Sequence, residues 1–139
     1  MKLNIYCDGG ARGNPGPAAA ACVIKADTGK VIHTLGVYIG IATNNIAEYR
    51  GVLLAYDWLV NNAVSLGVSS ANFNLDSLLV VNQLMGKYKT KNDQLKSLNE
   101  KISELHKSLA GIEISYGHIP RNLNSLADSL VNKTLDMNN

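Results

Sequence analysis

Apolar and polar residues alternate with period two in the first part of the chain, which predicts β-strands. The segment Leu3–Asp8 alternates in this way, and the breaker-rich run Gly9–Pro17 after it predicts a loop. Ala18–Ala26 and Val31–Ile39 are rich in strand-forming residues and flank a turn at residues 27–30, which favours a hairpin. We therefore expect the first three elements to be strands of an antiparallel meander.

The spacing of apolar residues changes to that of a helix after residue 43. Asn44 or Asn45 is expected to cap this helix, and Gly67 closes the region. The buried stripe of the helix is expected to consist of Tyr49, Leu53, Tyr56, Val60 and Ala63. A short strand over Ala71–Asp76 and a short helix over Ser77–Met85 are predicted next.

Two further helices enclose one more strand in the last third of the chain. Apolar residues spaced alternately by three and four predict a helix over Asn92–Leu109, which Gly111 ends. Ile112–Tyr116 is expected to form the fifth strand. The closing helix is expected to bury Leu123, Leu126, Ala127, Leu130 and Val131.

This order of elements, βββαβααβα, predicts an α/β fold with a mixed five-stranded sheet. The first three strands pair antiparallel, whereas the fourth and fifth follow helical crossovers and should run parallel to the first. Helices are expected on both faces of the sheet. A chain of 139 residues and 14.9 kDa has the size of one domain, so residues 1–139 are predicted to form a single domain.

Composition excludes several classes of protein. With 46% apolar and 17% charged residues, the chain can bury a sizeable core, which rules out disorder. The longest apolar runs, Ala18–Ile24 and Val52–Val60, are much shorter than a membrane span, and the N-terminus lacks a signal-peptide layout. We therefore expect a cytoplasmic protein with no membrane partner, in which Cys7 and Cys22 are reduced core thiols.

Net charge is only +2, but the basic residues are unevenly distributed. Six lysines and three acids lie between Gly86 and Ala110, which gives this segment a charge of +3. The lysines are Lys87, Lys89, Lys91, Lys96, Lys101 and Lys107. Such a segment is either a solvated helix face or a surface that contacts phosphates.

Four acids occupy unusual places: Asp8 and Asp76 at predicted strand ends, and Glu48 and Asp128 near the starts of predicted helices. Side chains at the carboxyl ends of adjacent parallel strands converge, and two carboxylates there repel each other unless a cation lies between them. Oxygen ligands suit Mg²⁺ or Mn²⁺. Each acid also has an ordinary interpretation as a turn residue, a capping-box residue or a partner of the helix dipole.

Four sequence blocks resemble the motifs of the type 1 ribonucleases H. Residues 8–17 (DGGARGNPGP) resemble the first motif of that family, and residues 43–50 (TNNIAEYR) the second. Asp76-Ser77 with Val80–Gln83 resembles the third motif, and residues 120–128 (PRNLNSLAD) the fourth. The blocks arrive in family order, the resemblance extends over nearly the whole chain, and the expected order of strands and helices matches the family fold.

This resemblance implies an endonuclease that hydrolyses the RNA strand of RNA–DNA hybrids with two metal ions and leaves 5′-phosphate and 3′-hydroxyl ends. The implied metal ligands are Asp8, Glu48, Asp76 and Asp128, with Mg²⁺ as the expected ion and Mn²⁺ as an alternative. The resemblance also implies that the backbone of Gly9, Gly10 and Ala11 approaches the 2′-hydroxyls of the RNA. The positions implied to contact the DNA strand and its phosphate are Asn14, Thr43, Asn44 and Asn45. These four residues are equally typical of turns and helix caps.

The sequence departs from the family pattern in two places. Some members carry a basic protrusion built from an extra helix; here residues 86–91 join two helices directly, and Lys87, Lys89 and Lys91 are candidates to replace it in part. Some members also place a mobile histidine after the fifth strand. His118 is either this residue or simply the end of the strand, whereas Arg121 shares a helix face with Asn124 and Asp128 and is the preferred helper.

Two other functions compete with hybrid cleavage. One is a catalytically weak or silent nucleic-acid-binding domain with the same fold, against which the presence of all four acids argues. The other is a phosphotransferase related to sugar kinases and actin, which needs two such domains to enclose ATP, whereas 139 residues supply one. We expect the protein to act as a monomer.

Overall fold

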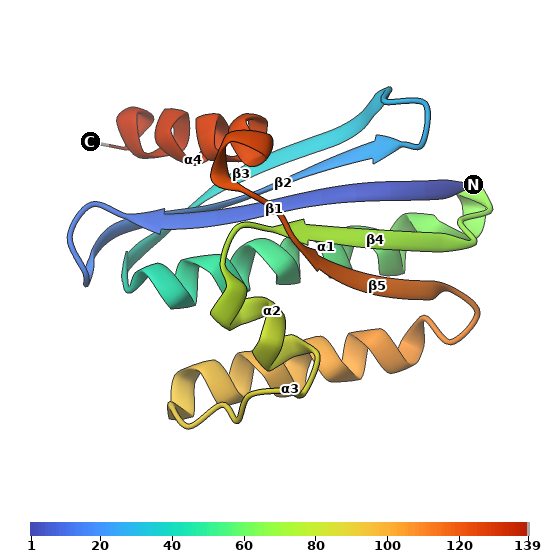
Figure 1. The fold of residues 1–139 in the computed structure, drawn as a ribbon. Helices are drawn as coiled ribbons and strands as arrows, with labels where there is room; N and C mark the ends of the chain where they lie inside the picture. The colour runs from blue at the N-terminus through green and yellow to red at the C-terminus, as the bar shows by residue number, and fades with distance from the viewer. Residues whose placement is uncertain (139) are drawn as a thin grey trace.

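The computed structural model describes residues 1–138 and consists of one five-stranded sheet with helices on both faces (Figure 1). The strands are β1 (Lys2–Ala11), β2 (Gly16–Ala26), β3 (Val31–Ala42), β4 (Ser70–Leu75) and β5 (Glu113–His118). The helices are α1 (Asn44–Leu66), α2 (Leu78–Leu84), α3 (Asp93–Ser108), the 3₁₀ turn η1 (Arg121–Asn124) and α4 (Ser125–Met137). The strand order is β3-β2-β1-β4-β5. Strands β1, β2 and β3 are antiparallel and β1, β4 and β5 are parallel, which are the directions that the sequence predicts.

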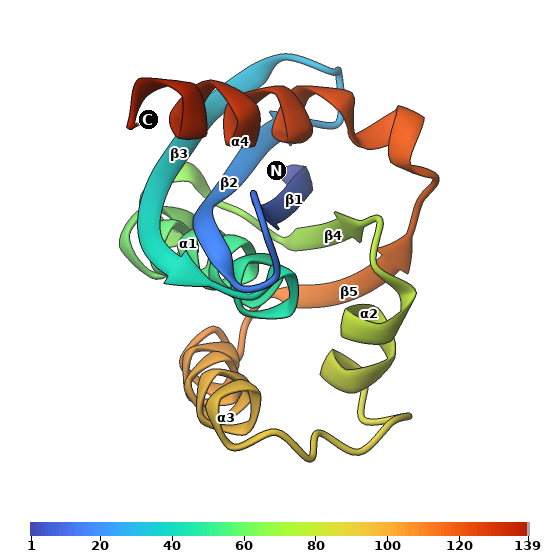
Figure 2. The same cartoon turned by 90° about the vertical axis from the view of Figure 1, so that its left-hand side faces the viewer.

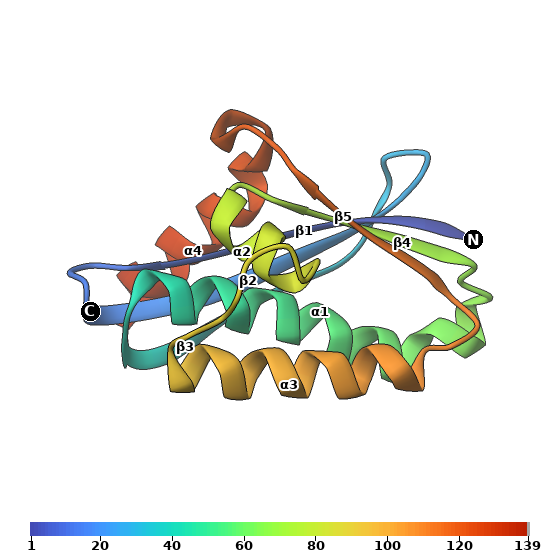
Figure 3. The ribbon, with the colours of Figure 1, turned by 60° about the horizontal axis from the view of Figure 1, so that its bottom comes forward.

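Helices form a layer on each face of the sheet. α1 packs on one face of the sheet and α3 packs on α1, while α4 covers β1, β2 and β3 on the opposite face (Figures 2 and 3). The main core lies between the sheet and α1; its largest side chains include Tyr49, Tyr56, Phe73, Ile5, Ile24 and Leu59. Among residues 1–138, no helix is long and apolar enough to cross a membrane.

The predicted loop at Gly9–Pro17 is wrong over most of its length. β1 continues through Gly9, Gly10 and Ala11, which pair with Ala20, Ala19 and Ala18 of β2. Only residues 12–15 connect the two strands. The alanines of β2 are small enough to lie opposite the glycines. Pairing between β1 and β2 keeps the backbone N–H and C=O groups of Gly9 and Gly10 hydrogen-bonded. Asp8 therefore lies inside a strand and not at its end.

The helix boundaries agree closely with the predictions, but three details differ. Thr43, rather than Asn44 or Asn45, caps α1, because its hydroxyl accepts a hydrogen bond from the backbone N–H of Ile46 at 3.2 Å. Val60 is exposed on the outer side of α1. Leu123 and Leu126 are also exposed, since the buried stripe of α4 begins at Ala127 and continues through Val131 and Leu135.

Candidate metal centre and substrate pocket

Three of the four candidate acids meet in space. Asp8 from β1, Glu48 from the second turn of α1 and Asp76 just after β4 each offer a carboxylate oxygen, and these atoms all lie within 4.8 Å of one another. Asp8 and Glu48 are buried, whereas Asp76 is half-buried. The cluster opens into a pocket of about 280 Å³ between β1, α1 and α4.

The close approach of α1 to β1 holds Asp8 and Glu48 together. A Cβ at Gly9 would overlap the backbone carbonyl of Ala47, and one at Gly51 would lie 2.6 Å from the carbonyl oxygen of Asp8. The two glycines therefore allow the helix backbone to rest directly on the strand. The backbone N–H of Gly9 donates to Oε1 of Glu48 at 3.4 Å, which ties the acid to the strand.

Burial and crowding make this cluster electrostatically costly as an assembly of free carboxylates. Burial, together with repulsion from Asp76 and Asp128, raises the pKa of Asp8 to about 6. The pKa of Glu48 is also raised, mainly by burial and then by the nearby charge of Asp8. Oε2 of Glu48 is buried and accepts no hydrogen bond from residues 1–138. A divalent cation fits this donor set, since it supplies positive charge and a partner for the unsatisfied oxygen.

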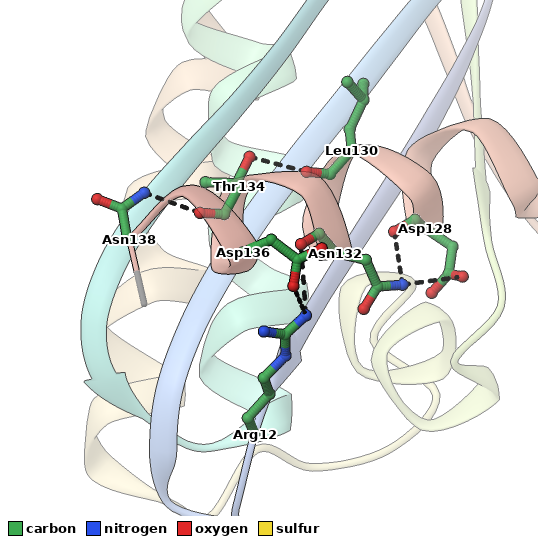
Figure 4. Close-up of polar contacts among 7 residues, drawn as sticks. All are labelled: Arg12, Asp128, Leu130, Asn132, Thr134, Asp136 and Asn138. Carbon is green, nitrogen blue, oxygen red and sulfur yellow. Dashed lines mark hydrogen bonds and ion pairs between the residues drawn. The ribbon is translucent and has the colours of Figure 1, made fainter.

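Asp128 lines the same pocket but lies outside the three-acid cluster. Its Oδ1 is 3.6 Å from a guanidinium nitrogen of Arg121. Its Oδ2 accepts a hydrogen bond from Nδ2 of Asn132 at 3.4 Å (Figure 4). Both α4 and η1 thus contribute to the pocket wall. The predicted proximity of Arg121 to Asp128 is present, although Arg121 lies in η1 rather than in the last helix itself.

Asn124 does not share the exposed position of Arg121. Its side chain is buried, and its Nδ2 donates to the carbonyl oxygen of Cys7 at 2.8 Å and to Oδ2 of Asp76 at 3.2 Å. Its helical spacing from Arg121 and Asp128 indicated a shared face. The 3₁₀ geometry of η1 changes this face, so the side chain points inward and reaches Cys7 in β1 and Asp76 just after β4.

The predicted substrate residues divide into two groups. Gly9, Gly10, Ala11 and Asn44 line the pocket together with Arg121. Asn14, Thr43 and Asn45 are not among the described residues that line it. Asn14 is nevertheless linked to the wall, because its Oδ1 accepts from the backbone N–H of Asn44 at 3.0 Å, and Oδ1 of Asn44 accepts from the N–H of Ala11 at 2.9 Å.

His118 lies apart from the acids, and so does the stretch that holds Lys87, Lys89 and Lys91, called the lysine segment below. His118 is exposed at the end of β5, in register with Leu75, and is not among the described residues of the pocket lining. Lys87, Lys89 and Lys91 are exposed on the segment that joins α2 directly to α3.

Several residues that line the pocket were not predicted from the sequence. These are Arg12, Val131, Asn132 and Leu135. Arg12 donates to Oδ1 of Asp136 at 2.6 Å and to the carbonyl oxygen of Asn132 at 3.4 Å, and so attaches the β1–β2 turn to α4 (Figure 4). The helical spacing of Asn132, four residues after Asp128, was the available signal.

Comparison with known proteins gives a consistent family assignment. A family described as reverse transcriptase-like matches residues 6–134. The bifunctional protein Rv2228c of Mycobacterium tuberculosis is 41% identical over 137 residues, which are 98% of this chain but only 36% of that protein. This chain therefore spans about a third of the length of that relative.

Two solved structures cover the whole fold. The RNase H1 of the halophilic archaeon Halobacterium salinarum superimposes with a TM-score of 0.86 at 36% identity, covering 98% of this chain and 98% of that chain. LC11-RNase H1, isolated from compost and solved in complex with an RNA/DNA hybrid, superimposes with a TM-score of 0.90 at 38% identity, covering 97% of each chain. The chain belongs to the reverse transcriptase-like family and, within it, to the type 1 ribonucleases H.

Proposed function

We propose that this protein is an endonuclease that hydrolyses the RNA strand of RNA–DNA hybrids and leaves 5′-phosphate and 3′-hydroxyl ends. The observation that carries the proposal is the convergence of Asp8, Glu48 and Asp76 within 4.8 Å in an open pocket whose rim holds Asp128 and Arg121. Three crowded carboxylates have no evident structural purpose, because their mutual repulsion destabilises the fold in the absence of a cation. Residues 1–139 are proposed to act as one domain.

The four acids are proposed to hold two divalent ions, with Mg²⁺ as the expected species and Mn²⁺ as the alternative. When bound, such ions supply Lewis-acid charge at the scissile phosphate and acidify a coordinated water. The protein then needs no nucleophile of its own. Its carboxylates bind and orient, and burial of Asp8 and Glu48 excludes bulk water from their side of the pocket.

The remaining residues are proposed to select and position the hybrid. Gly9, Gly10 and Ala11 bring backbone to the pocket wall, where it can meet the 2′-hydroxyls of RNA. The amide oxygens of Asn14 and Asn44 are occupied by backbone N–H groups, which leaves their Nδ2 groups to donate to phosphate oxygens of the DNA strand. Thr43 and Asn45 are proposed to act beside them at the start of α1.

Further binding energy is proposed to come from cationic residues, one in the pocket and three outside it. Arg121 is proposed to contact the phosphate or assist product departure. Lys87, Lys89 and Lys91 are proposed to attract the nucleic-acid backbone. We also propose that the protein acts as a cytoplasmic monomer.

Cleavage of a labelled RNA–DNA hybrid in Mg²⁺ tests the function directly. We expect cutting of the RNA strand only, with no cutting of a DNA duplex of the same sequence, and no cutting when EDTA removes the metal. Asp8→Asn is expected to abolish turnover while the protein still folds. Hybrid binding without any cleavage by the wild type in Mg²⁺ or Mn²⁺ would instead identify a silent binding domain.

A further inference from the structure

Asn124 is among the least exposed polar side chains of the protein. It is the last residue of η1, it is 1% exposed, and it lies beneath the start of α4. Its Nδ2 group uses both of its protons, one on the carbonyl oxygen of Cys7 and the other on Oδ2 of Asp76. One side chain thereby connects β1 next to Asp8, the end of β4, and the segment that leads into α4.

The other end of the same amide is unsatisfied. Oδ1 of Asn124 is buried and accepts no hydrogen bond from residues 1–138. A buried acceptor without a partner destabilises a fold, and an apolar side chain of similar volume, such as leucine, would avoid that cost. Packing alone therefore does not explain asparagine at this position. The two hydrogen bonds that Nδ2 donates explain the asparagine, and only the one to Asp76 ends on a carboxylate.

Asp76 gains most from this contact. It is the half-buried member of the three-acid cluster and follows the last residue of β4, so the sheet ladder does not hold it. The hydrogen bond from Asn124 fixes one carboxylate oxygen at 3.2 Å and thereby limits rotation of the group. Partners of this kind orient metal-binding carboxylates in proteins.

We propose that Asn124 is a positioning residue that orients Asp76 for metal binding and couples the start of α4 to the acidic cluster. This inference rests on the proposed function, because it assigns a role within the same metal site. Asn124 acts through Asp76 and touches neither metal nor substrate. Its role is distinct from that of Arg121, which faces the pocket itself.

Asn74 of β4, two residues before Asp76, provides a matched control. It is a buried asparagine whose Nδ2 donates to the carbonyl oxygen of Ile5 at 3.1 Å and to that of Asn72 at 3.3 Å, and to no carboxylate. Asn74→Leu therefore removes a buried amide with two donated hydrogen bonds from the same region without removing a contact to the cluster. Any general loss of stability should appear in both variants.

The test measures Mn²⁺ binding by isothermal titration calorimetry without nucleic acid, with Asn124→Leu compared with wild type and Asn74→Leu. We expect Asn124→Leu to raise the dissociation constant for Mn²⁺ about 10- to 100-fold, and Asn74→Leu to leave it unchanged. In hybrid cleavage at saturating metal, kcat should fall for Asn124→Leu while KM for the hybrid stays the same. Asn124→Ala, which introduces no new bulk, repeats the measurement if the leucine variant does not fold.

Wild-type Mn²⁺ affinity and kcat in the folded Asn124 variants would overturn the positioning role, even if their melting temperatures fall. An equal loss of Mn²⁺ affinity in Asn74→Leu would also overturn it, since the effect would then be general. The outcome for the proposed function is separate. A wild-type protein that binds Mn²⁺ with the expected dependence on Asn124, but never cuts a hybrid, would contradict hybrid cleavage and leave the positioning role intact.

Discussion

The guanidinium of Arg121 and the carboxylate of Asp128 form an ion pair at 3.6 Å on the rim of the acidic pocket. The side chain of Arg121 is 83% exposed, so water screens this pair and little free energy holds the two groups together. A phosphate or a metal ion that enters the pocket can therefore take either partner at low cost. The pair keeps Arg121 near the pocket and available for substrate.

Arg121→Ala is expected to lower kcat for hybrid cleavage by about 10- to 100-fold, the equivalent of one charge-assisted hydrogen bond of about 1.5–3 kcal/mol. His118→Ala should have a smaller effect, because His118 lies at the end of β5 and outside the described pocket lining. Single-turnover cleavage compares the two variants. The reverse ranking would identify His118 as the residue that assists the reaction.

The crowded acids predict an unusual dependence of stability on pH. The pKa of Asp8 is about 6 in the folded chain against 3.8 for the ordinary group, so between these values the folded chain holds a proton that the unfolded chain has released. Stability from this group is therefore present at low pH and is lost as pH rises through about 6. Asp8→Asn removes the ionisation, so it should stabilise the metal-free protein at pH 7 by about 1–3 kcal/mol but have little effect near pH 4.

Thermal unfolding at both pH values in EDTA measures this difference. Asp57→Asn, which neutralises an exposed acid on the outer side of α1, is the control and should leave the melting temperature unchanged. Mg²⁺ should reduce or reverse the advantage of Asp8→Asn, because the ion stabilises the wild-type carboxylates. An equal gain in stability at pH 4 and pH 7 would contradict the electrostatic explanation.

Gly9 and Gly10 are neighbours with very different surroundings, which makes them a matched pair. A Cβ at Gly9 would overlap the backbone of Ala47, whereas a Cβ at Gly10 would meet only Cγ1 of Val131 at 3.6 Å. Gly9→Ala is therefore expected to destabilise the protein by about 2–4 kcal/mol and Gly10→Ala by less than about 1 kcal/mol. Urea unfolding measures both, and similar losses would show that α1 does not rest directly on β1.

The lysine segment predicts a change in the salt dependence of binding. If Lys87, Lys89 and Lys91 contact phosphates, their combined replacement by alanine should flatten the slope of log affinity against log salt by roughly three. Hybrid binding is measured across a salt series in Ca²⁺, which should fill the metal site without supporting cleavage. At saturating hybrid, kcat should remain nearly unchanged.

A second triple variant separates local contact from total charge. Lys30, Lys101 and Lys107 are exposed, with Lys30 in the β2–β3 turn and the other two on α3, and none lies in the segment between α2 and α3. Their replacement by alanine removes the same charge and should leave the slope largely unchanged. Equal slopes for the two triple variants would show that the segment is only a solvated face.

The sequence predicted the existence and relative directions of all five strands, because hydrophobic period and crossover length are local signals with global consequences. It did not predict the order of the strands across the sheet. It also predicted that four acids meet; Asp8, Glu48 and Asp76 do, whereas Asp128 lies outside their cluster. It failed where a residue's role depends on its tertiary neighbours. The glycines after Asp8 predicted a loop because their low strand propensity is visible in the sequence, whereas the alanines of β2 that pair with them are visible only in the register.

Asn124 illustrates the same limit at the site. Its position before α4 is typical of a helix cap, yet its side chain makes no cap hydrogen bond and instead reaches Cys7 and Asp76. These partners are 117 and 48 residues away in sequence, so no local pattern could predict them. Leu126 shows the converse, an apolar residue at helical spacing that the η1 turn leaves 42% exposed.

The direct link between α2 and α3 has a consequence for how this protein can diversify. Its charged residues lie on an exposed surface segment, whereas the acids are held by β1, α1, the end of β4 and α4. The proposed affinity for a polyanion and the proposed metal site thus depend on different segments of the chain. An insertion between Lys87 and Lys89 would lengthen a loop at small entropic cost without touching the ligands of the metal. This segment is therefore a suitable insertion site, at which evolution or protein engineering can change the affinity for nucleic acid while the proposed metal site stays the same.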